Sequence, residues 1–176
     1  MRIAVLAAMA ALMLAGGARA EVIDKGDYGF RLKTVEQIKA SPATVYRALF
    51  DIGRWWNPEH TYSHVSSNLH LPPTANGCFC ESVGLNGSAR HGVVVLVIPN
   101  HTLRLETALG PLQGEGVAGA LTFDVKGGDN NGTELTVTYN VGGARPFIVK
   151  FAPNVDAVVT EQAARLKRYV ETGRPQ

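Results

Sequence analysis

Glu81 is the residue of this sequence whose surroundings most favour acid or base chemistry. It lies in segment 78–83, which has the pattern of a β-strand, and strand side chains alternate between two faces. Phe79 is the natural inward residue of this strand, so we expect Glu81 to point inward as well. A buried carboxylate loses solvation, and its pKa rises unless the group is paired. Such a carboxylate is suited to act as a general acid or base.

Two histidines are candidate partners for this carboxylate. His91 begins the apolar strand 91–98 and has the parity of the valines at alternate positions after it, so we expect it beside Glu81 across the hairpin. His60 is the second candidate, and either imidazole would complete an acid and base pair. The alternative interpretation is a structural ion pair or hydrogen bond at the rim of the fold.

Aromatic residues supply the remaining candidates for a binding site. Trp55 and Trp56 follow a predicted helix, and both are candidate ligand-binding residues. We expect at least one of them to line a cavity, and the alternative is that one fills the core under the helices. His60 and Tyr62 are candidate hydrogen-bonding groups at the cavity edge, although their polar segment is also typical of a surface loop. The aromatic residues expected to face a ligand from the sheet are Phe79, Phe123 and Tyr139.

Cys78 and Cys80 are the only cysteines, and strand alternation places both on the outward face. Residues two apart on a strand lie near the upper separation that a disulfide permits, so a bridge would be strained. Two unpaired thiols are the preferred interpretation, and the bridge stays open as an alternative in an oxidising compartment. A metal clip would need further soft ligands, and His60 with His64 alone does not make a zinc site. We therefore expect no metal and no cofactor.

The elements that must position these residues follow one another in a simple order. Residues 30–39 have the pattern of a strand whose alternation slips near Thr34, which a β-bulge would explain. Ser41 followed by Pro42 predicts a helix start, and the short helix covers 42–51. The other predicted elements are a helical turn at 54–58, strands at 68–71, 78–83, 91–98, 102–109, 120–126 and 133–141, and a long helix at 154–171. In strands 120–126 and 133–141 every second residue is apolar, and the apolar stripe of the long helix includes Val155 and Val158. The loop at 109–119 is a candidate lid over the cavity.

A sheet of about seven antiparallel strands must curl, and one amphipathic helix over its concave face cannot fill the space beneath it. The sequence therefore predicts an α+β fold with two short helices, a long C-terminal helix and an internal cavity. This order resembles the helix-grip fold of the SRPBCC superfamily, which includes START and birch-pollen-allergen-like proteins. Within residues 30–172, local segments are similar to those of the polyketide cyclase/dehydrase-like members. The similar segments are IKASPATVYRALFDI (38–52), RWW (54–56), GCFCE (77–81), LGPLQ (109–113) and GTELTVTY (132–139).

The first twenty residues have the pattern of a secretory signal peptide, with Arg2 before an apolar run and Ala18 and Ala20 at the expected cleavage point. We expect cleavage after Ala20, one domain at 21–176, and a periplasmic or secreted location. The 17 basic and 15 acidic residues become 15 of each when Arg2 and Arg19 are removed. A neutral domain without a basic cluster disfavours nucleic acid as a partner. The apolar run is shorter than a typical span of about 20 residues, so we expect no stable membrane insertion.

These observations favour an exported binding protein that holds a hydrophobic or aromatic small molecule in an internal cavity. The resemblance implies a lipid-like or polyketide-like ligand, but it predicts the fold more specifically than the function. The alternative is an enzyme of cyclase, dehydratase or hydrolase type in which Glu81 works with His91 or His60, and Tyr62 or Tyr139 stabilises an oxyanion. A protein-binding module would instead show a large exposed apolar patch. No feature indicates an oligomeric state.

Overall fold

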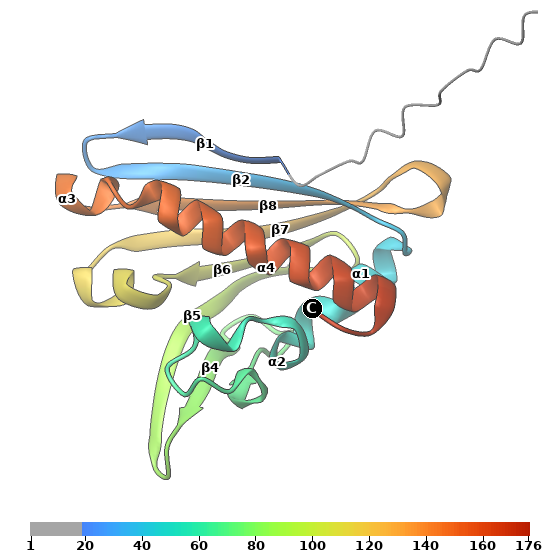
Figure 1. Ribbon diagram of the computed structural model, residues 1–176, viewed down its shortest axis with the longest axis horizontal. Helices are drawn as coiled ribbons and strands as arrows, with labels where there is room; N and C mark the ends of the chain where they lie inside the picture. The colour runs from blue at the N-terminus through green and yellow to red at the C-terminus, as the bar shows by residue number, and fades with distance from the viewer. Residues whose placement is uncertain (1–18) are drawn as a thin grey trace, which may run out of the picture.

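The computed structural model describes residues 19–176. The predicted signal peptide falls on residues 1–18, outside this range, and on the first two residues of the first strand. All strands of the described region form one antiparallel sheet in the order β1-β2-β8-β7-β6-β5-β4-β3 (Figure 1). The strands are β1 (Arg19–Gly26), β2 (Gly29–Ile38), β3 (Leu69–His70), β4 (Cys78–Val83), β5 (Gly87–Ile98), β6 (Thr102–Thr107), β7 (Ala118–Gly127) and β8 (Thr133–Gly142).

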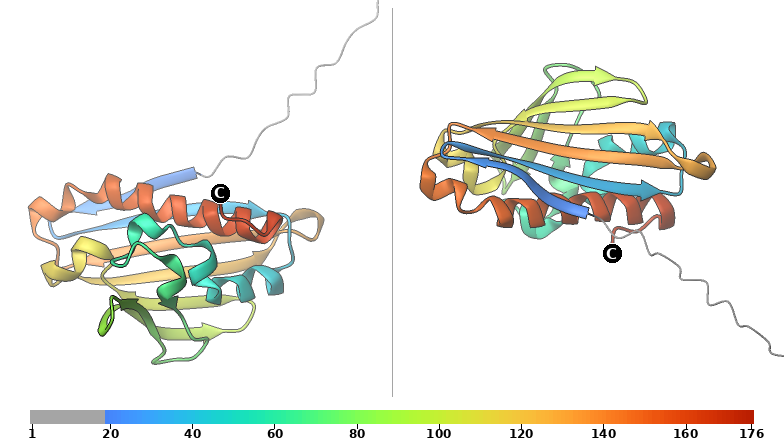
Figure 2. Two further views of the ribbon diagram at one scale, coloured as in Figure 1. Left: turned by 60° about the horizontal axis from the view of Figure 1, so that its bottom comes forward. Right: turned by 90° about the horizontal axis from the view of Figure 1, so that it is seen from above.

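The long helix α4 lies across one face of the sheet, where it packs against β1, β2 and β8 (Figures 1 and 2). The predicted α+β helix-grip fold is therefore confirmed, with eight strands rather than about seven because β1 adds an edge strand. The α-helices are α1 (Pro42–Phe50), α2 (Ile52–Trp55), α3 (Pro146–Val149) and α4 (Ala152–Thr172). The 3₁₀ helices are η1 (Pro58–His60), η2 (Ser66–Asn68), η3 (Gly110–Glu115) and η4 (Asp129–Asn131). Within residues 19–176, no helix is both long and apolar enough to cross a bilayer.

The core forms where the inward faces of the strands meet α4. The alternation predicted for β7 and β8 is confirmed, because every second side chain is buried and the polar positions between them are mostly half-buried. On α4 the apolar stripe that faces the sheet includes Val159, Ala163 and Leu166. The buried residues of the two strands are Leu121, Phe123, Val125, Leu135, Val137, Tyr139 and Val141.

The bulge predicted near Thr34 is wrong. Strand β2 alternates without interruption, and the bulge of the β1–β2 hairpin lies in β1. The apparent slip arises because two inward positions carry polar residues that pair with α4. The hydroxyl groups of Thr34 and Thr160 lie 2.6 Å apart, and Lys167 Nζ lies 3.2 Å from Glu36 Oε2.

Hydrogen bonds at a helix cap and to backbone oxygens fix the positions of the short helices at one end of the molecule. Ser41 Oγ accepts the Thr44 N–H at the start of α1, as predicted. The indole N–H of Trp55 donates to the Ala48 oxygen at 2.8 Å, which fixes α2 against α1. Arg165 of α4 donates to the Trp55 oxygen at 2.8 Å. The segment that follows α2 is thereby held beside α4.

Candidate functional site

A cavity of about 620 Å³ lies beside the N-terminal half of α4, between η1, η3 and α3. Figure 2 shows the η1 and η3 segments near each other along this helix. Most of the lining is apolar, and the apolar wall includes Trp56, Leu109, Leu112, Ile148, Val155 and Val158. A larger open groove of about 970 Å³ lies near the η4 hairpin, but most of the side chains that line it are polar or charged, and it contains none of the candidate residues. The smaller cavity is therefore the candidate site.

Four of the predicted site residues line this cavity: Trp56, His60, Tyr62 and His91. They come from η1, the segments flanking it, and strand β5. Glu81 lies behind this layer, where it contacts both His91 and the backbone of Tyr62. The predicted cavity is thus present, but it opens beside one end of α4 instead of extending along the sheet beneath it.

Four other predicted ligand-binding residues do not line the cavity, because they fill the core. Trp55, Phe79 and Phe123 are at most 4% exposed. Tyr139 is fully buried, and its hydroxyl donates to the Thr107 oxygen and accepts the Leu109 N–H, both at 3.2 Å. Burial raises the pKa of Tyr139 to about 12. Its hydroxyl is therefore a structural link between β6, β8 and the segment leading to η3.

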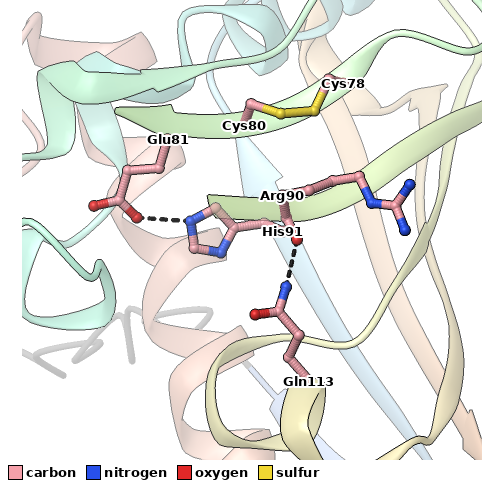
Figure 3. Close-up of a disulfide and its surroundings, with 6 residues drawn as sticks. All are labelled: Cys78, Cys80, Glu81, Arg90, His91 and Gln113. Atoms are coloured by element: carbon pink, nitrogen blue, oxygen red, sulfur yellow. Dashed lines mark hydrogen bonds and ion pairs between the residues drawn. A yellow bond between two sulfur atoms is a disulfide. The ribbon is translucent and has the colours of Figure 1, made fainter. Parts of the chain in front are cut away.

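Glu81 and His91 form a buried pair at the wall of the cavity. Glu81 is 1% exposed and His91 is 5% exposed. His91 Nε2 lies 2.7 Å from Glu81 Oε2, as Figure 3 shows. The same carboxylate accepts the Tyr62 N–H at 3.1 Å and the Ser63 N–H at 2.5 Å. Three donors thus converge on Glu81, and the expected contact between Glu81 and His91 is present.

These donors determine the charge of the carboxylate. Burial alone would raise the pKa of Glu81, but the hydrogen bonds from Ser63, Tyr62 and His91 more than offset it and lower the pKa below its usual value. Glu81 is therefore ionised at neutral pH. Its chemistry is that of an anion that accepts a hydrogen bond from His91 and orients the imidazole ring, rather than that of a neutral acid.

The imidazole of His91 keeps one nitrogen available. With the Nε2 proton directed at Glu81, Nδ1 has no hydrogen-bond partner among the residues that the structure describes. Figure 3 shows this nitrogen on the side of the ring away from Glu81. The ring stacks on Tyr62 with centroids 5.5 Å apart and packs against Phe79 at 4.9 Å. Neighbouring aromatic rings and Glu81 thus fix the orientation of an imidazole that borders an apolar cavity.

A β-bulge in β5 positions His91. Phe79 pairs with Gly92 and Cys80 pairs with Arg90, so His91 is the extra residue of the hairpin. The predicted parity is wrong. The valines at alternate positions after His91 are half-buried or exposed, whereas Val94, the second residue after Gly92, is buried. Thr107 Oγ1 donates to the His91 oxygen at 2.5 Å, which satisfies the carbonyl of the bulged residue. The bulge turns His91 toward Glu81.

The two cysteines form a disulfide on the outward face of β4 (Figure 3). The preferred interpretation of two unpaired thiols is therefore wrong. The Cα atoms of Cys78 and Cys80 are 5.2 Å apart, within the range that a disulfide spans. Both cysteines are partly exposed, whereas Phe79 and Glu81 on the opposite face of the strand are buried.

Helix η3 closes one side of the cavity. The Tyr62 hydroxyl donates to Gln113 Oε1 at 3.0 Å, and Gln113 Nε2 donates to the Arg90 oxygen. An ion pair between Arg145 and Glu115 joins η3 to the residue before α3. The segment predicted as a lid therefore adjoins the cavity as a 3₁₀ helix tied to η1, β5 and α3.

His60 lies at the other side of the cavity in a local polar network. Its Nε2 lies 3.1 Å from Glu161 Oε2, and Asn57 donates to the other oxygen of Glu161 at 2.6 Å. His60 pairs with Glu161, whereas Glu81 pairs with His91. His64 does not share a helical face with His60, because η1 ends at His60. Among residues 19–176, no group of three His, Cys, Asp or Glu side chains is placed to hold a metal ion.

The wall that sequence reasoning missed comes from α3 and the start of α4. Phe147 and Phe151 border the cavity and remain 61% and 44% exposed, with ring centroids 5.2 Å apart. Their spacing of four residues after Pro146 is a signal for a short helix with an aromatic face. Val155 and Val158 were expected on the apolar stripe of the long helix, and both line the cavity.

No protein-family model and no curated protein matches this sequence. Solved structures share its fold. EF2215 from Enterococcus faecalis, a conserved protein of unknown function, superposes with a TM-score of 0.62 at 16% identity over 89% of this chain and 78% of that one. DynU16, from the dynemicin biosynthetic locus, gives 0.61 at 22% identity over 82% and 48% of the two chains. The di-domain ARO/CYC StfQ, from the steffimycin biosynthetic pathway, gives 0.55 at 11% identity over 84% and 52%.

The chain thus spans about half the length of DynU16 and of StfQ. At these identities the likeness concerns the fold alone, in which a curved antiparallel sheet is covered by a long C-terminal helix.

Proposed function

We propose that this chain is an exported member of the SRPBCC superfamily that binds a hydrophobic or aromatic small molecule in the cavity beside α4. The observation that carries the proposal is a cavity of about 620 Å³ with a mainly apolar lining and two imidazoles, those of His60 and His91, in its wall. Small-molecule sites have this size and this mixture of apolar surface with a few polar groups. The fold shared with DynU16 and StfQ supports a polyketide-like ligand class.

The polar groups at the cavity favour a ligand with an aromatic ring and a hydrogen-bonding substituent. Trp56 and Tyr62 offer ring surfaces, and His91 Nδ1 is free to accept a phenol or hydroxyl proton. Export is supported by the pattern of the first twenty residues, and the mass of the protein recovered from its host tests it. A mature chain that begins at Glu21 is the expected result.

Binding is tested by blocking the cavity from α4. Val158 lines the cavity, whereas the adjacent Ala157 is exposed on the outer side of the same helix. Titration with the fluorescent probe 8-anilinonaphthalene-1-sulfonate is expected to show at least about tenfold weaker binding to Val158→Trp, because the indole removes cavity volume. Ala157→Trp is the matched control and should bind as the wild type does. Equal affinity of the two variants would overturn the assignment of this cavity as the binding site.

A second candidate function is proton transfer on the bound molecule, of the cyclase, dehydratase or hydrolase type. The buried Glu81–His91 pair with a free Nδ1 at the cavity favours it. In this reaction His91 takes or gives the proton, and Glu81 stabilises the imidazolium that forms. With a substrate that the cavity accepts, His91→Gln should abolish turnover and leave the affinity for the probe nearly unchanged. Unchanged turnover would show that His91 does not carry the reaction, and the absence of turnover for every molecule that the wild type binds would leave binding as the function.

A further inference from the structure

We propose that the Cys78–Cys80 disulfide is a redox-active site that exchanges with a dithiol, and that its reduction displaces His91 from its contact with Glu81. Both cysteines are partly exposed on the outward face of β4, so a thiol can reach the bridge from solvent. Nothing in this proposal requires a ligand in the cavity.

The bridge closes a very short loop. Its two residues are separated by two positions in the sequence. In the chain-entropy account the stabilisation from a disulfide grows with the length of the loop that it closes, so this bridge restricts the unfolded chain very little. A bridge with so small a structural benefit is better suited to chemical exchange than to holding the fold together.

The bridge also shortens the strand that carries it. Two residues of an extended strand advance roughly 6.6 Å, whereas the Cα atoms of Cys78 and Cys80 are 5.2 Å apart. Strand β4 is thus contracted around Phe79. On the opposite face of this contracted segment, Phe79 packs against the His91 ring.

The contraction coincides with the bulge in the neighbouring strand. Cys78 pairs with Val93 and Cys80 pairs with Arg90, so three residues of β4 oppose four residues of β5. Because β4 is contracted, the paired segment of β5 is longer than the segment of β4 that it faces. The bulge at His91 takes up this difference in length. When reduction lets β4 extend, the difference falls and the bulge relaxes. The side chain that the bulge directs toward Glu81 then moves.

The surroundings of the bridge favour exchange and connect it to the cavity. Arg90 lies directly across from Cys80 on the paired strand, so its positive charge is carried on the same outward face from which a thiolate would be released. The Arg90 oxygen accepts from Gln113, so a change at the bulge also reaches η3. Figure 3 shows the bridge, Arg90, the acid–imidazole pair and Gln113 in one region.

The exchange is chemically balanced with a dithiol as the reductant. One thiolate of the dithiol attacks a cysteine sulfur, the S–S bond breaks, and the released cysteine thiolate takes a proton from solvent. The second thiolate of the dithiol then displaces the other cysteine and closes the disulfide of the reagent. Two electrons pass from the dithiol to the cysteine pair, and the reverse reaction restores the bridge.

The first test reduces the native protein with dithiothreitol and traps thiols with iodoacetamide. We expect mass spectrometry to find both cysteines alkylated while circular dichroism shows a folded protein. Protection of the bridge until the protein unfolds would identify a structural disulfide and overturn the proposal.

The second test follows the imidazole signals of His91 by NMR spectroscopy, with His91→Gln to assign them. Reduction should shift the His91 signals and leave those of His101, an exposed residue in the β5–β6 turn, in place. The double variant Cys78→Ser/Cys80→Ser should reproduce the spectrum of the reduced wild type. His91 signals that are the same in the oxidised protein and in the double variant would refute the coupling, whether or not the cavity binds a ligand.

Discussion

The substitution Glu81→Gln tests the central electrostatic feature of the site, because it removes the charge and keeps the size of the side chain. The carboxylate accepts from the N–H groups of Tyr62 and Ser63 and from His91. A glutamine offers one oxygen, which best faces Tyr62 and His91, and its NH₂ group then opposes the Ser63 N–H. One donor loses its acceptor, and two hydrogen bonds lose their charge assistance.

Each of these losses has a known order of magnitude. An unsatisfied donor at a partly buried site costs about 1 kcal/mol or more, and replacing a charged acceptor by a neutral one costs about 1 kcal/mol for each bond. The expected decrease in the free energy of unfolding at pH 7 is therefore about 3 kcal/mol. A domain of ordinary stability remains folded after this loss, so urea denaturation can measure it.

The pH dependence has a defined sign. The pKa of Glu81 is lower in the folded protein than in the unfolded chain, so the unfolded chain binds the proton more readily. The stabilisation is present above the unfolded pKa of about 4.3 and is lost as the pH falls toward the folded pKa. The contribution of Glu81 titration to the difference in the free energy of unfolding between wild type and Glu81→Gln should thus be fully present above about pH 5 and should narrow as the pH falls below that. Glu106→Gln, at an exposed position of β6, is the matched control.

Two outcomes would refute this reasoning. The first is a loss at pH 7 of less than about 1 kcal/mol, since the three donors would then contribute little. The second is a difference in the free energy of unfolding between wild type and Glu81→Gln that widens as the pH falls below about 5. The pKa of Glu81 would then be raised in the folded protein. A comparable loss in Glu106→Gln would show that the effect belongs to net charge and not to the site.

Two further substitutions test the strand pair that carries the site. Cys78→Ser/Cys80→Ser should lower the free energy of unfolding by no more than about 2 kcal/mol, because the closed loop is so short; a urea midpoint that indicates more than about 4 kcal/mol would contradict this. Gly92→Ala should cost about 2 kcal/mol or more, because its Cβ would lie 2.7 Å from a backbone oxygen of β6. Thermal denaturation measures this loss of stability, and Gly26→Ala, with open space around the added Cβ, is the control.

The fold could be predicted from the sequence where local signals determine it. The cap formed by Ser41 and the period-two pattern of β7 and β8 depend only on neighbours along the chain, and both are confirmed. Strand β1 was missed because residues 21–26 carry no buried face of their own. Most of these side chains are exposed, and the strand exists because β2 offers it an edge for pairing. Edge pairing is a nonlocal property that polar residues do not signal.

The site could be predicted only in part, for the same physical reason. Strand alternation places Phe79 and Glu81 on the inward face, and this holds within one strand. The direction of the pKa shift depends on N–H donors from Tyr62 and Ser63, which approach Glu81 from an irregular segment of the chain. Neither contact has a periodic signal. The position of the cavity likewise depends on how η1 and η3 approach α4, so the apolar stripe of that helix does not reveal it.

The sequence contains a signal for the bulge at His91, and this signal explains why the alternation of side chains in β5 was predicted wrongly. Gly92 follows His91 and precedes a run of valine and leucine, and a glycine inside a strand marks a bulge or a close approach of another backbone. Both apply here, because an added Cβ at Gly92 would collide with β6 while the residue before it bulges. Alternation cannot be extended through such a position, since the extra residue reverses the parity of everything beyond it. The His91–Glu81 contact therefore follows from the irregularity itself, and a substitution that removes the bulge should remove the contact even where both side chains are kept.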